Sequence, residues 1–401
     1  MFYVTAVLCI AEILTMTGVA TYAALLPVLR AEWSANNTLA GAISGAFFAG
    51  YMAAVPILVS LTDRMAARRV YLWACAALAL GSIAFAYTPG PSGAMLAQAL
   101  LGAGLAGTYM PGLKELSDRT SGPRQGRAIA FYTSTFGLGS SLSLWMAGAL
   151  QSHAGWRAAF LAAGAGPMLA AALVLVALPA RTFVPATVSR RGLFRLVLKD
   201  RRIAGYVMGY AAHCWELFAF RSWMVAFLSF AAGGAALSAP TIAAVINLLG
   251  PPASISGNEI AAGRRLHTVR RLMVAGAVLA CLTGLSARSG PVIVIIVMSL
   301  YMLAITADSA ALTAGLIEVS PPEARGTAMA VYSFFGFAGA FMGPVVFGAL
   351  LDAGGGATAY RAWVLAFAGV AGVSVAGIVA LGQESRNAAI GSTVIARRAG
   401  R

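Results

Sequence analysis

Five ionisable side chains fall inside long apolar stretches of this 401-residue sequence, where a charged group is rare and costly. They are Glu12, His213, Glu216, Arg221 and Asp308. A charge at the centre of a membrane helix costs about 2.5 to 3.5 kcal/mol on insertion scales, so such groups are functional candidates by default. A carboxyl group in a low dielectric favours its neutral form, which suits reversible protonation. We therefore expect Glu12 or Glu216 to bind and release a proton, with His213 as a relay.

Other roles for these groups stay open. His213 and Glu216 are three residues apart and share a helix face, whereas Arg221 points elsewhere. Fixed ion pairs with other helices would make the groups around residue 216 structural. Three acids against one arginine favour a cation or a proton-linked neutral ligand, while Arg221 alone would suit a carboxylate or another small anion.

Metal-binding and enzymatic readings have less support. A divalent-metal carrier would draw its ligands from Glu12, His213, Cys214 and Glu216. Consecutive residues of a regular helix cannot both face one ion, which argues against it. An embedded hydrolase or acyltransferase would need a nucleophile, and no serine stands in an evident nucleophile elbow. Neither lysine precedes Ser or Thr, as a phosphate-binding loop requires. We expect no catalytic residue, no cofactor and no metal ion.

Aromatic side chains near the ionisable groups are candidates for the wall of a binding pocket. They are Trp215, Phe218, Phe220 and Trp223, opposite Tyr109 and Tyr301. Most aromatic residues in apolar helices only pack or face lipid, which is the alternative for this set. We assign Tyr109 and Trp215 to the predicted site.

The elements that must position these side chains are membrane-spanning helices. The chain is 60% hydrophobic and 10% charged with a mean hydropathy of +0.81, far from the roughly one-quarter charged residues of soluble proteins. We predict an all-α membrane protein, because apolar stretches recur at about the 20 residues that cross a bilayer core of about 30 Å. The twelve spans are 4–27, 38–60, 70–88, 92–113, 128–150, 157–179, 204–229, 238–256, 271–288, 291–315, 328–350 and 362–383.

Positive charge sets the predicted orientation. Of the 28 Lys and Arg residues, 23 follow even-numbered spans and four follow odd-numbered spans. The positive-inside rule then places both termini in the cytoplasm. This distribution explains the net charge of +15 without nucleic acid as a partner. We expect a multi-pass protein, monomeric, in the inner membrane of a bacterium.

The two halves of the sequence repeat each other. Pro56, Asp63 and the pair at 68–69 match Pro252, Glu259 and the pair at 264–265 at a spacing of 196, and Tyr132 matches Tyr332 at 200. Because each copy has an even number of spans, both enter the membrane from one side and form parallel repeats with a cavity between them. The expected domains are a bundle at 1–179, a cytoplasmic linker at 180–202, a second bundle at 203–383 and a cytoplasmic tail at 384–401.

The segment from Val59 to Arg69 resembles the loop signature of the major facilitator superfamily, commonly Gly-x-Leu-x-Asp-Arg-x-Gly-Arg-Arg. The runs at 155–160 and 321–326 also resemble members, and the resemblance covers the whole chain. It implies that spans one, four, seven and ten line a cavity, and these spans hold all five ionisable groups. A carboxylate at a helix end can bind the positive start of a neighbouring helix and nearby arginines. The gating residues implied in this way are Asp63, Arg64, Arg68, Glu259 and Arg264.

Together these features predict a secondary transporter that moves one small organic solute by alternating access, coupled to protons. A permease for small anions or carboxylates that uses Arg221 is the main alternative. A drug or metabolite exporter is a further one, although span five has Gly137 and Gly139 without the Gly-Pro pair of the antiporter signature.

Overall fold

The computed structural model of the protein describes residues 2–399 apart from 63, 121–124, 180–196, 198 and 233–234; beyond residue 382 it describes the backbone alone. Asp63 and most of the expected linker therefore lie outside the described residues. The described part is all-helical, with the spans in the order in which the sequence predicts them.

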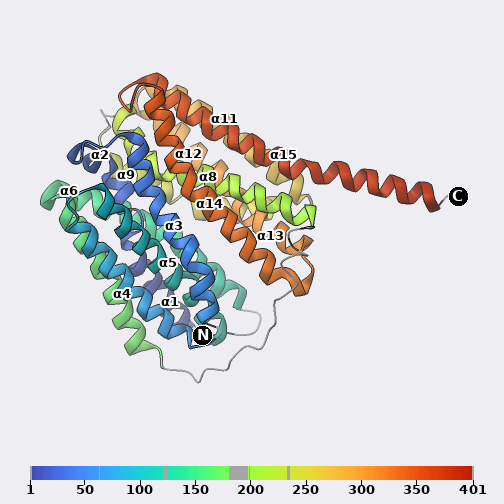
Figure 1. The fold of residues 1–401 in the computed structure, drawn as a ribbon, viewed down its shortest axis with the longest axis horizontal. Coiled ribbons are helices and arrows are strands. Elements are labelled where there is room, and N and C mark those ends of the chain that lie inside the picture. The colour runs from blue at the N-terminus through green and yellow to red at the C-terminus, as the bar shows by residue number, and fades with distance from the viewer. Residues whose placement is uncertain are drawn as a thin grey trace.

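The first half of the chain contains α1 (Phe2–Thr15), the short 3-10 helix η1 (Met16–Gly18), α2 (Thr21–Glu32), α3 (Asn37–Leu61), α4 (Ala67–Ala86), α5 (Pro91–Arg119) and α6 (Gln125–Ala177). The second half contains α8 (Arg201–Ala231), α9 (Ala239–Asn247), α10 (Gly250–Ala261), α11 (Arg265–Leu285), η2 (Ser286–Arg288), α12 (Pro291–Ala307), α13 (Ser309–Val319), η3 (Pro322–Ala324), α14 (Arg325–Ala353) and α15 (Tyr360–Ala399). In Figure 1 the two groups lie side by side, and α15 continues past the bundle.

Several predicted spans differ from single straight helices. The first is broken at η1 and the tenth at Asp308. The eighth divides into α9 and α10 because Pro251 and Pro252 lack the N–H groups that would continue α9. In α6 the break is at Gly155, whose φ of +80° suits glycine and separates the predicted fifth and sixth spans.

Eight helical segments of the described residues are long and apolar enough to cross a membrane. The segment Arg127–Ala177 counts as one although it holds two predicted spans, and the split pair α9–α10 is not counted. Neither α5 nor α8 is among the eight, and α8 carries His213, Glu216 and Arg221. The structure is thus that of a multi-pass helical membrane protein, and the number twelve stays a prediction.

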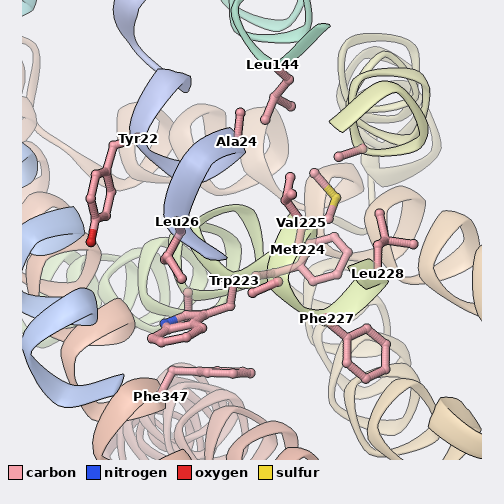
Figure 2. Close-up of a cluster of buried hydrophobic side chains, with 14 of the residues drawn as sticks. Tyr22, Ala24, Leu26, Leu144, Trp223, Met224, Val225, Phe227, Leu228 and Phe347 are labelled. Atoms are coloured by element: carbon pink, nitrogen blue, oxygen red, sulfur yellow. The ribbon is translucent and has the colours of Figure 1, made fainter. Parts of the chain in front are cut away.

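Among the described residues, the one cluster with fully buried members from both halves lies at one end of the molecule. We call the end that holds residues 33–36 the Trp33 end and the opposite one, with residues 64–66, the Arg64 end. At the Trp33 end one cluster joins both halves: Leu26 of the first half lies near Trp223 of the second, and Leu144 belongs to the same cluster (Figure 2). At the Arg64 end one cluster is confined to the first half and another to the second. The halves are therefore joined at the Trp33 end.

Close backbone contact between α3 and α14 makes most of this junction. A Cβ atom at Gly41 would lie 2.2 Å from the carbonyl oxygen of Pro344, and one at Gly348 would lie 2.1 Å from that of Asn37. Small residues allow such approach at membrane helix contacts. Further along, Tyr51 stacks on Phe337 with ring centroids 4.0 Å apart.

Candidate functional site

A small cavity of about 60 Å³ lies at the boundary between the two halves. Its lining combines aromatic rings with neutral polar groups and one arginine. The lining residues come from the start of α2 and from α3, α5, α6, α8 and α9, and include Tyr22, Ser44, Phe47, Phe48, Gln98, Phe136, Ser140, Phe218, Arg221, Ser222 and Asn247. Because both halves contribute, relative movement of the halves would change the cavity's shape.

Arg221 is the only charged residue among the described residues of this lining. Its guanidinium carbon lies 5.7 Å from the ring centroid of Phe136 and 5.9 Å from that of Phe218. The Nε atom is buried without a hydrogen-bond partner, and no acid of the described residues lies within ion-pair distance of the side chain. A guanidinium held between aromatic rings without a counter-ion is available to an anion.

Asn247, at the end of α9, links the second half to α6. Its Nδ2 donates to the hydroxyls of Ser140 and Ser141, each at 2.9 Å, and to the carbonyl of Gly137 at 3.3 Å. Its Oδ1 is buried and has no hydrogen-bond partner among the described residues, and the same holds for the hydroxyl of Ser44 in the same cavity. Sequence reasoning missed both residues, because neutral polar side chains in apolar helices are common.

Glu12 lies apart from the cavity, fully buried within the first half. The Tyr132 hydroxyl donates to Glu12 Oε2 at 2.9 Å, and Oε1 has no hydrogen-bond partner. The same hydroxyl lies 3.1 Å from the carbonyl oxygen of Tyr109, whose ring is 5.8 Å from that of Tyr132. The predicted residues Glu12 and Tyr109 thus belong to one buried group, centred on a tyrosine.

His213 and Asp308 form a second buried pair, within the other half. His213 Nδ1 lies 2.7 Å from Asp308 Oδ1, and both side chains are almost fully buried. Asp308 occupies the break between α12 and α13. Tyr210 stacks on the imidazole and, with centroids 3.8 Å apart, on Tyr332. The pair is an ion pair when the imidazole carries a proton.

These two buried groups occupy repeat-related positions. The spacing of 200 that relates Tyr132 to Tyr332 also relates Thr108 to Asp308. Thr108 lies beside the Glu12 group, since its carbonyl oxygen is 3.4 Å from the Tyr132 hydroxyl. In both halves a buried acid thus lies at this repeat-related place beside the fourth helix, contributed by the first helix in one copy (Glu12) and by the break in the fourth helix in the other (Asp308).

Glu216 belongs to neither group. The Ser374 hydroxyl on α15 donates to its Oε2, and its Oε1 faces Gly276 on α11. Trp215 packs its backbone against Gly339 and Gly343 of α14. Among the predicted site residues, only Arg221 lines the cavity. No cluster of three His, Cys, Asp or Glu side chains that could hold a metal occurs in the part of the chain that the structure describes.

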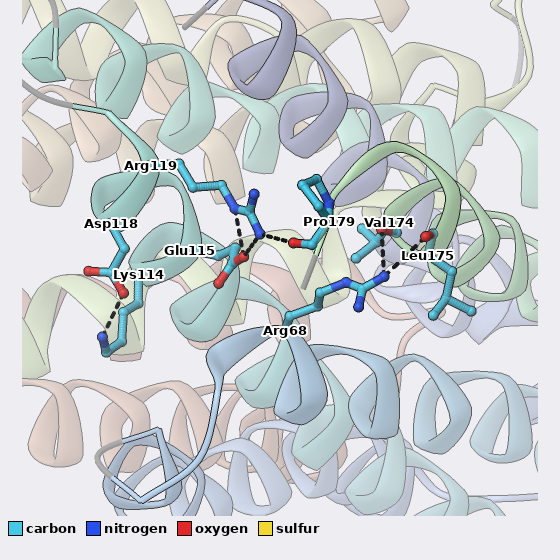
Figure 3. A network of polar contacts seen from close by, with 8 residues as sticks. All are labelled: Arg68, Lys114, Glu115, Asp118, Arg119, Val174, Leu175 and Pro179. Atoms are coloured by element: carbon cyan, nitrogen blue, oxygen red, sulfur yellow. Dashed lines mark hydrogen bonds and ion pairs between the residues drawn. The ribbon is translucent and has the colours of Figure 1, made fainter. Parts of the chain in front are cut away.

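Of the predicted gating residues, the four that the structure describes lie at the Arg64 end. Arg68, at the start of α4, donates to the carbonyls of Leu175 at 3.0 Å and Val174 at 3.4 Å, near the end of α6 (Figure 3). Arg64, Glu259 and Arg264 are exposed. The contacts of Arg68 stay within its own half, so it does not join the two halves in this state.

A polar contact between the halves occurs at the Trp33 end instead. The Asp352 carboxylate, in the last turn of α14, accepts bonds from the backbone N–H groups of Asn37 at 3.1 Å and Thr38 at 2.8 Å. It also accepts bonds of 2.7 Å from the side chains of both residues. A carboxylate at the start of a helix is stabilised by the helix dipole and by the free N–H groups there. The sequence Asn36-Asn37-Thr38 at the start of the second span could have indicated this contact, because polar side chains and free N–H groups at a helix start attract a carboxylate.

Comparisons with known proteins agree with this architecture. The family model described as the Major Facilitator Superfamily matches residues 8–306. A bacterial homologue of the human lysosomal transporter Spinster, inward-facing and unoccupied, has a TM-score of 0.71 at 16% identity, with 94% of each chain covered. Its inward-facing occupied form has a TM-score of 0.75 at 15% identity, again with 94% of each chain covered.

The nucleoside transporter NupG is similar as well, with a TM-score of 0.74 at 16% identity over 94% of this chain and 98% of that one. At these identities the likeness establishes the fold. A search of curated protein sequences finds no match.

Proposed function

Because the chain belongs to the major facilitator superfamily, we propose that it carries one small organic solute across the membrane by alternating access, coupled to protons. Membership makes it a membrane transporter and not an enzyme. The observation that carries the proposal is the cavity at Arg221, because it lies where the two halves meet and takes residues from both. A solute held there is released when the halves part on one side.

The arrangement of the halves supports alternating access. The shared core and the Asp352 contact hold the Trp33 end shut, while the clusters at the Arg64 end are separate. The positive-inside rule assigns the Arg64 end, with its many arginines, to the cytoplasm. The state is then inward-facing, as the two similar Spinster-homologue structures are. Opening the other side requires Asp352 to leave the start of α3.

The partners of the buried acids support proton coupling. Glu12 faces a tyrosine hydroxyl, Glu216 faces a serine hydroxyl, and Asp308 faces an imidazole. None of the three has a Lys or Arg of the described residues within ion-pair distance. A carboxylate without a permanent cation can take up a proton without leaving a charge unpaired. We propose Glu12 and the His213–Asp308 pair as the proton sites.

Transport by the purified protein in proteoliposomes tests the proposal. A thermal-shift screen against a panel of neutral, cationic and anionic metabolites first supplies a solute. We expect a pH gradient to drive its accumulation above that of protein-free liposomes. Glu12→Gln should lower gradient-driven uptake at least tenfold, because the amide cannot bind and release a proton. Exchange of solute across the membrane should stay intact, because it needs no net movement of protons.

Glu32→Gln serves as the matched control, since Glu32 is exposed and lies 3.7 Å from Arg157 outside the cavity. Its uptake should equal that of the wild type. Accumulation no greater than in protein-free liposomes for every solute that binds would contradict transport, and gradient-driven uptake by Glu12→Gln at the wild-type rate would remove Glu12 from the coupling.

A further inference from the structure

Polar groups without protein partners converge on the central cavity. Arg221 Nε, Ser44 Oγ and Asn247 Oδ1 are all buried and unpartnered, and all three residues line it. The side chains of Gln98 and Ser222, also buried there, make no hydrogen bond with another described residue. Buried polar groups in native proteins are nearly always satisfied, so this concentration needs an explanation. A polar ligand that supplies the missing bonds provides it.

The charge of the lining determines the charge of that ligand. Arg221 is the only ionised residue, and no carboxylate occurs, among the lining residues that the structure describes. A guanidinium binds a carboxylate through parallel N–H bonds, and the rings of Phe136 and Phe218 exclude water from the pair. An ammonium group would find a positive neighbour and no counter-ion. The ligand is therefore a monoanion without a cationic group.

The orientation of Asn247 determines the second feature of the ligand. The carbonyl of Gly137 can only accept, so the nitrogen of the Asn247 amide, and not its oxygen, must face α6. Its Oδ1 is left as an acceptor that needs a donor. A hydroxyl on the ligand supplies this donor and can also accept a bond from Ser44 or Ser222.

The volume of the cavity limits the size of the ligand. It measures about 60 Å³, whereas a water takes up about 30 Å³ in the liquid and a cavity of about 150 Å³ holds a six-atom ring. The ligand is therefore small, and a short hydroxy acid of about six non-hydrogen atoms enters only when the two halves that line the cavity move slightly apart.

We propose that the ligand is a small hydroxycarboxylate. This proposal rests on the proposed function, in which the cavity is the binding site of the transported solute. Arg221 binds its carboxylate, and Asn247 Oδ1 accepts a hydrogen bond from its hydroxyl. The proposal assigns Asn247 as a residue that determines specificity, because it separates a hydroxy acid from the matching acid without the hydroxyl.

Equilibrium binding of radiolabelled lactate to the purified wild-type protein tests this. Propionate, which lacks only the hydroxyl, should compete at least tenfold more weakly, and alanine, which adds an ammonium, should compete more weakly still. Arg221→Met should lose lactate binding at least tenfold, while Arg157→Met, at an exposed arginine, should retain it. Asn247→Leu should bring lactate down to the affinity of propionate, and Ser44→Ala gives a second variant with a smaller effect in the same direction.

Equal competition by propionate and lactate, tighter binding of alanine, or unchanged binding by a folded Arg221→Met would overturn the assignment. The proposed transport function and the proposed substrate class can be disproved independently of each other. If another solute is accumulated in proteoliposomes but lactate does not bind, the substrate class is wrong and transport stands. If lactate binds at Arg221 but no solute is accumulated, the site stands and transport is wrong.

Discussion

At the scale of single residues, the contact with the clearest consequence is that of Asp352 with the start of α3. One carboxylate satisfies two backbone N–H groups and two side chains of the opposite half. Hydrogen bonds to a charged group contribute about 1.5 to 3 kcal/mol each, less where water competes. In the alternating-access cycle that we propose, these bonds exist only while the Trp33 end is closed, so they would favour that state over the other.

We predict that Asp352→Asn shifts the protein toward opening at the Trp33 end by about 1 to 2 kcal/mol, roughly tenfold in population. The measurement is labelling of Ser44→Cys in the cavity by a membrane-impermeant thiol reagent applied from the Trp33 side, after the four native cysteines are replaced. Labelling should become faster. Asp118→Asn at the other end of the molecule is the control, and equal rates in the two variants would exclude a gating role for Asp352.

Sequence reasoning located the buried ionisable residues better than it located the cavity. Glu12, His213, Glu216 and Asp308 are buried as polar residues in apolar spans. Their grouping depends on how helices pack, which a sequence does not reveal. The cavity's acceptor, Asn247, is neutral and produces no charge signal, and its role follows only from the bonds that it makes to α6.

At the scale of elements, glycines distinguish contacts within a half from contacts between halves. A Cβ at Gly102 on α5 would lie 1.8 Å from the Phe47 carbonyl on α3, inside the first half. The corresponding contact of Gly41 is with Pro344 on α14, across the boundary. The first contact persists in any state of a rocking transporter, and the second is relieved when the Trp33 end opens.

Gly102→Val and Gly41→Val should therefore behave differently. Overpacking costs about 1 to 3 kcal/mol where the backbone cannot move away. Gly102→Val should unfold at a lower temperature than the wild type and yield less folded protein. Gly41→Val should unfold within a few degrees of the wild-type temperature. In the Ser44→Cys background, Gly41→Val should also increase the rate at which the thiol reagent applied from the Trp33 side labels the cysteine. Similar loss of stability in both variants would mean that the halves form one rigid body.

The order of the helices could be predicted from the sequence, whereas most breaks within them could not. The apolar pattern predicted the order of the spans and the boundary at Gly155. It did not predict that the tenth span is interrupted at Asp308, because a single polar residue does not end a hydrophobic stretch. Pro251 and Pro252 were visible in the sequence, and their effect on α9 follows from their missing N–H groups.

At the scale of the whole molecule, the repeat in the sequence explains the architecture. Two copies in parallel orientation place equivalent helices on opposite sides of a central boundary. The structure shows these halves joined at the Trp33 end and with separate cores at the Arg64 end. The family membership was predictable from the loop motifs. The conformational state was not, since the alternating access that we propose requires one sequence to stabilise both an inward-facing and an outward-facing state.

Paired distances measured across each end of the protein in liposomes would reveal whether the two halves rock about the cavity. Spin labels at Ala31 and Thr358 report on the Trp33 end, and labels at Ser60 and Ala262 report on the Arg64 end; all four positions are exposed. Pulsed EPR at pH 5 and pH 8, with and without bound solute, gives both distances. We expect reciprocal changes, in which the Trp33-end distance lengthens as the Arg64-end distance shortens. Two distances that stay fixed in every condition, or that lengthen together, would contradict the rocking motion.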